Sequence, residues 1–287
     1  MSKILITGAT GHLGKTIIAH LLKHTTHDNL VALARDENKA DFLKEKGIEV
    51  RIGNFDDTAS LDKAMQGISK VLLISSSELQ RRFQQHKNVV DAAKKAGVKH
   101  MVYTSVSMKD INTSAIKVLM ESHFQTEDYI KESGMGYTFL RNSLYADVIP
   151  MFVGENVLET GIYLPAGDGK ISFAFREEMG EATAKVLNTG GHENTTYTLA
   201  NVETYSYQNV AEILSEISGK EINYFSPEVE DYTKTLTDAG VPKQYIDMFS
   251  GFALAKAKGE FDIVSDDLEQ LLGRKPASLK TYLKTIY

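Results

Sequence analysis

A glycine-rich turn near the start of the chain constrains the fold more than any other stretch. The turn, GATGHLG at 8–14, follows an apolar run at 4–7 and precedes residues 15–23, where apolar side chains recur at helical spacing. A strand, a glycine turn and a helix in this order form an anion site, because a pyrophosphate can approach a backbone without Cβ atoms and meet the free N–H groups of the helix start. The residues that we expect to bind a dinucleotide are Gly8, Thr10, Gly11, His12, Leu13 and Gly14.

The first half of the chain alternates between apolar β-branched runs and amphipathic stretches. We predict strands at 4–7, 30–34, 49–52, 71–75, 100–104 and 137–140, and helices at 12–24, 37–46, 58–66, 82–96 and 116–133. This alternation favours parallel strands joined by right-handed crossovers. The sequence therefore predicts an α/β fold with a Rossmann-type doubly wound parallel sheet.

The rhythm changes after residue 140, where glycines and prolines divide the chain into shorter pieces. Helices are expected at 176–188, 207–218, 228–239 and 242–257, with strands at 197–200 and 221–225. We predict an NAD(P)-binding Rossmann domain at 1–145 and a smaller mixed α/β lobe at 146–287, partly interleaved with the sheet. Open α/β sheets bind ligands outside the carboxyl ends of their strands, so we expect the substrate between the two parts.

Composition narrows the function classes. The chain has no cysteine, which excludes disulfides, thiolate nucleophiles and metal–thiolate sites, and its histidines have no metal-ligand spacing. A formal net charge of −6 without a basic block gives no reason to expect nucleic acid. No apolar run approaches the roughly 20 residues of a membrane helix. The first strand begins within three residues of the start, so no signal peptide is expected and we predict a cytoplasmic protein.

The end of the second predicted strand indicates which dinucleotide binds. Arg35 stands about where the adenosine ribose is expected, and Lys39 follows one helical turn later. An arginine here accommodates the 2′-phosphate of NADP, whereas a carboxylate would pair with the 2′-hydroxyl of NAD. Asp36 is interpreted as the cap of the following helix. We expect NADPH, with solvated surface charges as the alternative for Arg35 and Lys39.

Six motifs give the chain a family resemblance. They are ITGATGHLG at 6–14, LISSS at 73–77, AAKKAGV at 92–98, YTFLRN at 137–142, AGDGK at 166–170 and LSEISGK at 214–220. With them the chain resembles the NmrA-like atypical short-chain dehydrogenases, in particular the bacterial group that includes an NADPH-dependent quinone oxidoreductase and triphenylmethane reductase. The resemblance implies an NADPH cofactor without flavin or metal.

The same resemblance suggests contacts for the adenine. In short-chain dehydrogenases an aspartate at the position of Asn54 commonly hydrogen-bonds the adenine, and Asn54 can do so through its amide. Phe55 can pack on the adenine ring. The alternative is a polar loop that caps the helix from Thr58.

Serines and a threonine follow the fourth and fifth predicted strands, where the nicotinamide is expected. We expect Ser75, Ser76 and Thr104 to contact the cofactor and Ser77 to line the substrate pocket. Serines at strand ends are also ordinary turn residues, which is the alternative.

The catalytic pair of standard short-chain dehydrogenases is missing. These enzymes use Tyr-x-x-x-Lys, in which the lysine lowers the tyrosine pKa. Here the tyrosine position falls on Leu119 and the lysine position on His123. His123 is expected to hold the nicotinamide ribose or supply a proton. The alternative is a structural histidine held by a backbone group or by Glu127.

The sixth predicted strand leads toward the expected substrate. Asn142 is a natural partner for the nicotinamide carboxamide, and Tyr145, Phe152 and Phe173 offer an aromatic wall for a flat substrate. Plain core packing is the alternative for these rings. We assign His123, Asn142 and Tyr145 to the catalytic site.

These features favour an NADPH-dependent oxidoreductase that transfers hydride directly to a quinone or a similar flat, electron-poor acceptor. Such an acceptor becomes a stabilised anion and needs no strong acid, so the reaction tolerates the missing tyrosine. One alternative is a redox sensor of the NmrA type that binds NADP(H) without turnover. A nucleotide-sugar epimerase or reductase is disfavoured without Tyr-x-x-x-Lys. The oligomeric state stays open, a homodimer being one alternative.

Overall fold

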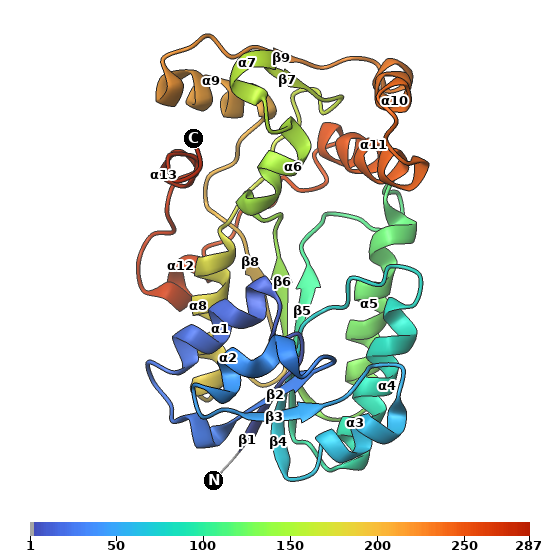
Figure 1. Cartoon of the computed structure of the whole chain (residues 1–287), viewed down its shortest axis with the longest axis vertical. Helices are drawn as coiled ribbons and strands as arrows, with labels where there is room; N and C mark the ends of the chain where they lie inside the picture. The colour runs from blue at the N-terminus through green and yellow to red at the C-terminus, as the bar shows by residue number, and fades with distance from the viewer. Residues whose placement is uncertain (1–2) are drawn as a thin grey trace. The chain divides into compact units, whose positions relative to one another are not determined.

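The computed structural model describes residues 3–287, and its central element is a seven-stranded sheet (Figure 1). The strand order is β3-β2-β1-β4-β5-β6-β8. Neighbouring strands from β3 to β6 run parallel. The strands are β1 (Lys3–Ile6), β2 (Leu30–Ala34), β3 (Glu49–Ile52), β4 (Ile68–Leu73), β5 (His100–Val106), β6 (Gly136–Asn142) and β8 (Thr195–Leu199). The predicted Rossmann-type doubly wound sheet is confirmed.

Helices cover both faces of this sheet (Figure 1). On one face lie α3 (Thr58–Ala64), α4 (Arg82–Lys95) and α5 (Lys117–Glu132). They bury Leu61, Val89 and Ile130 in one apolar core with residues of the sheet. On the other face α1 (His12–Leu21) packs against α8 (Arg176–Asn188). A Cβ on Gly180 would lie 2.4 Å from Cγ2 of Thr16, so this contact requires glycine.

The chain divides into two compact units. The first comprises residues 1–106, 119–142 and 176–198, and the second 107–118, 143–175 and 199–287. The second unit contains a small sheet of β7 (Ile162–Tyr163) and β9 (Tyr224–Phe225). Its helices are α6 (Ile149–Val153), α7 (Val157–Thr160), α9 (Tyr207–Ser218), α10 (Val229–Asp238), α11 (Lys243–Ala257), α12 (Asp267–Leu272) and α13 (Leu279–Leu283).

Most predicted elements occur within a few residues of their expected bounds. The helix expected at 37–46 is a 3₁₀ turn (Asn38–Ala40) followed by the four-residue α2 (Asp41–Lys44). Before this 3₁₀ turn Asn38 N donates to Oδ1 of Asp36 at 3.0 Å. The strand expected at 221–225 is limited to β9. The sequence analysis did not predict α6, α7, β7, α12 and α13.

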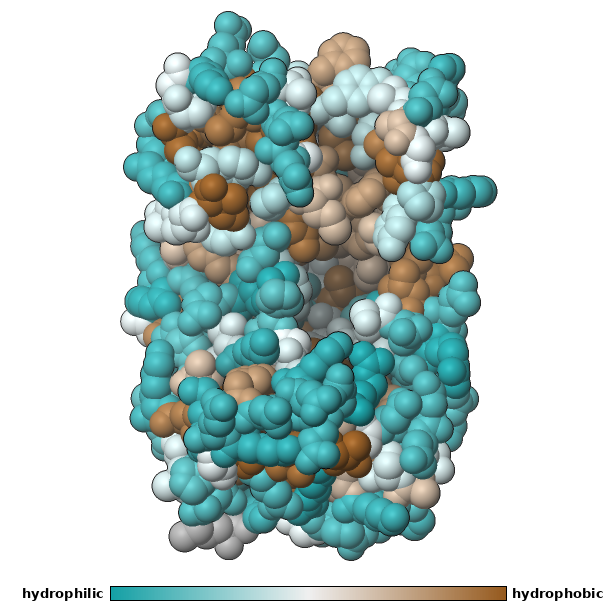
Figure 2. All heavy atoms as spheres, viewed as in Figure 1, coloured by the Kyte–Doolittle hydropathy of each residue, from teal (hydrophilic) through white to brown (hydrophobic). Residues whose placement is uncertain are grey.

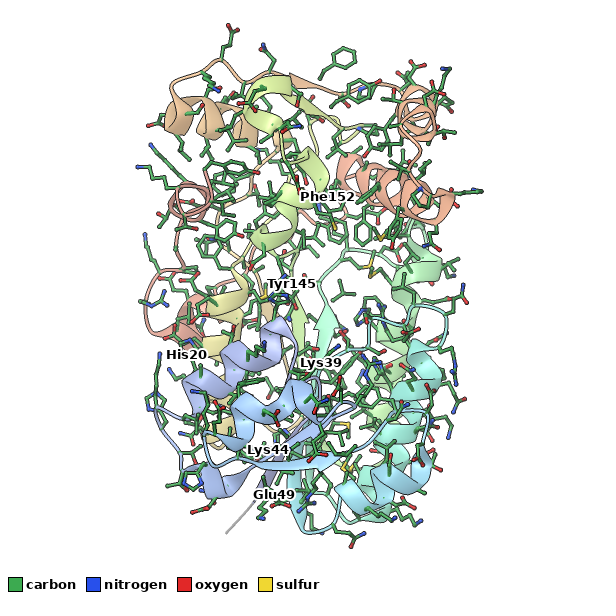
Figure 3. All side chains as sticks on the ribbon, viewed as in Figure 1. His20, Lys39, Lys44, Glu49, Tyr145 and Phe152 are labelled. Atoms are coloured by element: carbon green, nitrogen blue, oxygen red, sulfur yellow. The ribbon has the colours of Figure 1, made fainter. Side chains whose placement is uncertain are left out.

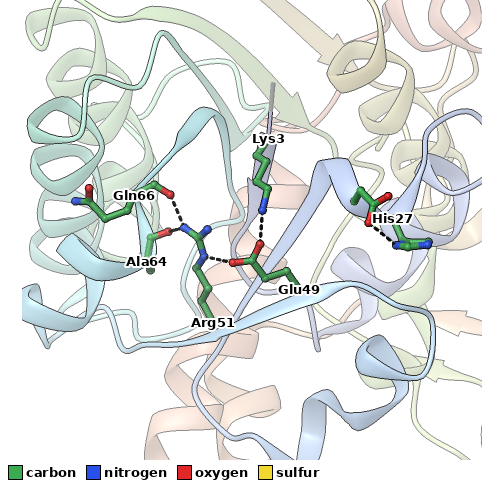
Figure 4. Close-up of polar contacts among 7 residues, drawn as sticks. Lys3, His27, Glu49, Arg51, Ala64 and Gln66 are labelled. Carbon is green, nitrogen blue, oxygen red and sulfur yellow. Dashed lines mark hydrogen bonds and ion pairs between the residues drawn. The ribbon is translucent and has the colours of Figure 1, made fainter. Parts of the chain in front are cut away.

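Polar contacts tie the amino ends of β1 and β3 together (Figure 4). Glu49 accepts from Lys3 Nζ and from Arg51 Nε, and Arg51 also donates to the carbonyls of Ala64 and Gln66 at 2.6 and 2.7 Å. These donors hold the pKa of Glu49 below its usual range. Exposed pairs of this kind stabilise a fold only weakly. These contacts lie at the amino ends of the strands, and the glycine turn follows the carboxyl end of β1.

The drawn face of the surface is mostly hydrophilic, with hydrophobic residues in smaller groups (Figure 2). The large hydrophobic side chains with the greatest exposure among residues 3–287 include Val118, Phe225 and Val264, which belong to separate segments. Scattered exposure of this kind is ordinary for folded proteins. Within the same residues, no helix combines the length and the apolar character needed to span a membrane.

Candidate functional site

The glycine turn has the geometry of a tight phosphate loop. Gly8 has φ +60°, a left-handed conformation that favours glycine, and Gly11 N donates to Gly8 O at 2.9 Å. A Cβ on Gly14 would lie 2.2 Å from Gly8 O and 2.9 Å from the Cα of Ala9. The start of α1 therefore lies directly against the start of the turn, an arrangement typical of loops in which the first N–H groups of a helix bind an anion.

A pocket opens beside this turn, at the carboxyl ends of β1 to β4 in the first unit. It is lined by the six predicted residues of the turn, by the predicted Arg35, Asn54, Phe55, Ser75, Ser76 and Ser77, and by Leu33, Ala34, Gly53, Ile74 and Gln85. The structure thus brings together predicted residues from four separate loops. This is the place where a doubly wound sheet binds its ligand.

Three predicted cofactor contacts, Thr104, Lys39 and Asn142, lie outside the lining of this pocket. Thr104 is 2% exposed, and its Oγ1 accepts from Ser75 N at 2.9 Å, so it holds the pocket wall from behind. Lys39 is exposed in the 3₁₀ turn before α2 (Figure 3). Asn54 is exposed, and its Oδ1 accepts from Asp56 N at 3.1 Å.

Gln85 is a lining residue that the sequence analysis missed. Its Oε1 accepts from Ser76 Oγ at 2.6 Å, and its Nε2 donates to Oδ2 of Asp56 at 3.1 Å. Gln85 thereby links the loops that follow β3 and β4. Arg81, four residues before Gln85, pairs with the same carboxylate of Asp56 at 2.7 Å. This helical spacing was the only signal in the sequence that could have pointed to Gln85.

His123 lies in a buried cluster of the first unit and is 6% exposed. Its Nδ1 and the hydroxyl of Tyr103 are hydrogen-bonded at 2.9 Å. Burial, and then the nearby charge of Arg82, hold the pKa of His123 well below its usual range. Neither of the partners expected from the sequence bonds to this ring in any described contact, and Glu127 instead forms a two-point pair with Arg141, at 3.0 and 2.6 Å.

Asn142 ends β6, opposite Val106 of β5, and is 5% exposed. Tyr145, Phe152 and Phe173 belong to the second unit, where Figure 3 labels the first two. Tyr145 precedes a 3₁₀ turn and forms a backbone bridge with Ala174.

Two of the predicted aromatic residues are packed into the second unit. Phe173 is 1% exposed and meets Tyr207 edge-to-face. Phe152 meets the rings of Phe249 and Phe252 edge-to-face. These two rings of α11 extend the aromatic cluster, and the sequence analysis did not include them. Among the described residues, no group of histidine and acidic side chains has the arrangement of a metal site.

The comparisons with known proteins agree with this geometry. The model of the NmrA-like family matches residues 1–286. The chain belongs to the NmrA-like family. It is 38% identical over 277 residues to Quinone oxidoreductase 2 of Escherichia coli, covering 96% of each chain.

Solved structures of two reductases are similar over nearly the whole chain. Triphenylmethane reductase of Citrobacter sp., complexed with NADP(H), is 37% identical with a TM-score of 0.91, covering 99% of this chain and 100% of that one. The NADPH-dependent quinone oxidoreductase of Escherichia coli, complexed with NADPH, is 35% identical with a TM-score of 0.93, covering 99% of each. The resemblance predicted from the sequence motifs is confirmed.

Proposed function

We propose that the protein is an NADPH-dependent oxidoreductase that reduces a quinone or a similar flat, electron-poor acceptor. The observation that carries the proposal is the pocket at the glycine turn, where Gly8 has a left-handed φ, a Cβ on Gly14 would collide with Gly8 O, and Arg35 directly follows β2. Relatives with 35 to 38% identity are named as NADPH-dependent quinone and dye reductases. When bound, NADPH supplies a hydride at C4 of its nicotinamide.

The residues of the pocket suit the parts of NADPH. We assign the N–H groups of the glycine turn to the pyrophosphate and the cations of Arg35 and Lys39 to the 2′-phosphate. Asn54 and Phe55 border the adenine. Ser75 and Ser76 line the pocket beyond the pyrophosphate, with Thr104 supporting them through Ser75.

At the acceptor we assign orientation rather than acid catalysis to the protein. Asn142 is assigned to the nicotinamide carboxamide. Ser77, Tyr145 and Phe152 are assigned to the flat substrate, with Phe173 supporting them as a packed ring. Holding two reactants in a near-attack geometry supplies much of the rate of such a reaction.

His123 is assigned a positioning role. Its ring is buried, is hydrogen-bonded to the Tyr103 hydroxyl and has a lowered pKa, so it stays neutral at pH 7 and is a poor acid. A reduced quinone is a stabilised anion that water can protonate. The reaction therefore proceeds without the tyrosine that standard short-chain dehydrogenases use.

The alternatives from the sequence are less favoured. A sensor that binds NADP(H) without turnover, or a nucleotide-sugar enzyme, would leave the similarity to two named reductases unexplained. We further propose a cytoplasmic protein without a nucleic-acid partner, in keeping with its net charge of −6 and its lack of cysteine, and a monomer or homodimer in solution.

The experiment is an anaerobic assay with purified protein, NADPH and menadione or benzoquinone. The proposal expects loss of the nicotinamide absorbance well above the uncatalysed rate, and slower loss with NADH. Binding of NADPH without turnover on any quinone or triphenylmethane dye would favour the sensor and overturn the proposal.

A further inference from the structure

The loop after β4 forms one wall of the nucleotide pocket, and side chains rather than a strand hold its backbone. Ile74 N and Ser75 N donate at 2.9 Å to the hydroxyls of two buried threonines, one after β1 and one in β5. Ser76 N donates to Nε2 of His86 at 2.9 Å. Three successive N–H groups are thus fixed by three other segments of the first unit.

One face of α4 holds Ser76 at every polar group. Besides the bond from Ser76 N to His86, the Ser76 carbonyl accepts from Nε of Arg82 at 2.7 Å, and Ser76 Oγ donates to Gln85 at 2.6 Å. These three partners lie at positions i, i+3 and i+4 of α4 and are all buried. The position of Ser76 in the pocket wall therefore depends on this helix face.

His86 can make its contacts in one tautomer only. Because Nε2 accepts from Ser76 N, the proton lies on Nδ1, which donates to Oγ1 of Thr126 at 2.9 Å. The Thr126 hydroxyl in turn donates to the carbonyl of Ser122 at 2.7 Å. The ring is fully buried, and burial together with the charge of Arg82 lowers the pKa of His86 to about 3. The imidazole is therefore neutral.

We propose that His86 is a positioning residue for the dinucleotide, which fixes Ser76 through Nε2 and so sets the pocket wall against which NADPH binds. The inference rests on the proposed NADPH function. An imidazole suits this position because it accepts from a backbone N–H on one side and donates to a hydroxyl on the other while uncharged. His86 acts through Ser76 and is not itself among the residues lining the pocket.

The test compares two amides that each replace one ring nitrogen. His86→Gln places an acceptor near the position of Nε2 and keeps the contact with Ser76, whereas His86→Asn reaches only the position of Nδ1. We expect His86→Gln to bind NADPH within about twofold of the wild type, and His86→Asn to raise the Kd about tenfold, the effect of one lost buried hydrogen bond. Gln84→Ala, on the exposed face of α4, is the matched control.

Titration calorimetry with NADPH gives the Kd, and thermal unfolding shows whether each variant folds. Thr126→Val is the second variant: it removes the partner 2.9 Å from Nδ1 and leaves only the Tyr103 hydroxyl, 3.5 Å away, so the ring is held less firmly and the Kd should rise although Ser76 and His86 are both present. If His86→Asn and Thr126→Val both keep the wild-type Kd, or if Gln and Asn at 86 weaken binding equally, the inference is overturned. Failure of the wild-type protein to bind NADPH would instead overturn the proposed function.

Discussion

Replacement of Gly14 by alanine tests whether the close approach in the glycine turn shapes the cofactor site. The new Cβ would lie 2.2 Å from Gly8 O and 2.9 Å from Ala9 Cα, whereas ordinary contacts begin at 3.4 Å. The helix and the turn must therefore separate by roughly 1 Å. Gly14 is helical and has no left-handed φ, and alanine is the better helix former by about 1 kcal/mol, so any loss comes from the contact alone.

Overpacking of this kind costs about 1–3 kcal/mol. If this free energy is lost from cofactor binding, the NADPH Kd rises between about fivefold and a hundredfold. Titration calorimetry measures the Kd and thermal unfolding the stability. Gly97→Ala is the control, because Gly97 has φ +77° with open space around its Cβ position, and should lose about 1 kcal/mol of stability with an unchanged Kd. A Gly14→Ala protein with wild-type Kd and stability would refute the reasoning.

Three further outcomes follow from named groups. Arg35→Gln should raise the Kd for NADPH about tenfold and leave that for NADH unchanged, and equal effects on both would exclude a 2′-phosphate contact. Burial lowers the pKa of His86 to about 3, so lowering the pH from about 7.5 to about 5 should cost about 2 kcal/mol of stability, because the unfolded chain binds a proton that the folded chain does not. The lowered pKa of His123 acts in the same direction, and denaturant unfolding of His123→Gln should show a flatter pH profile than the wild type. Lys256 is fully buried and burial lowers its pKa, so the free energy of unfolding should rise with pH up to the ordinary pKa of lysine. Lys256→Met should flatten that rise and raise the unfolding temperature at pH 7. A lower unfolding temperature of this variant would contradict the reasoning.

The parts of the site that depend on local sequence could be predicted. Gly8 and Gly14 occur where a strand meets a helix, and the anion site at that junction depends on glycines that lie within one seven-residue stretch. Arg35 follows from the length of the first β-α-β unit, since the end of the next strand must lie beside the turn.

The supporting groups could not be predicted, because their partners come from other elements. His86 appears in a polar stretch of α4 and carries no signal of its contact with Thr126, which is 40 residues away. Lys256 lies in an ordinary helical stretch, yet its Nζ is 2.9 Å from the hydroxyl of Tyr207 and 3.0 Å from the ring centre of Phe152. Only the packing of the second unit shows that this amine is buried between aromatic rings.

The most direct test of the account is an anaerobic stopped-flow comparison of NADPH with NADPH deuterated at each face of nicotinamide C4, using menadione as acceptor. Direct hydride transfer predicts enzyme-dependent turnover that slows with the label on one face and not on the other, since a fixed nicotinamide presents one face to the acceptor. Turnover with no isotope effect from either face, or no turnover above the uncatalysed reaction, would contradict the account.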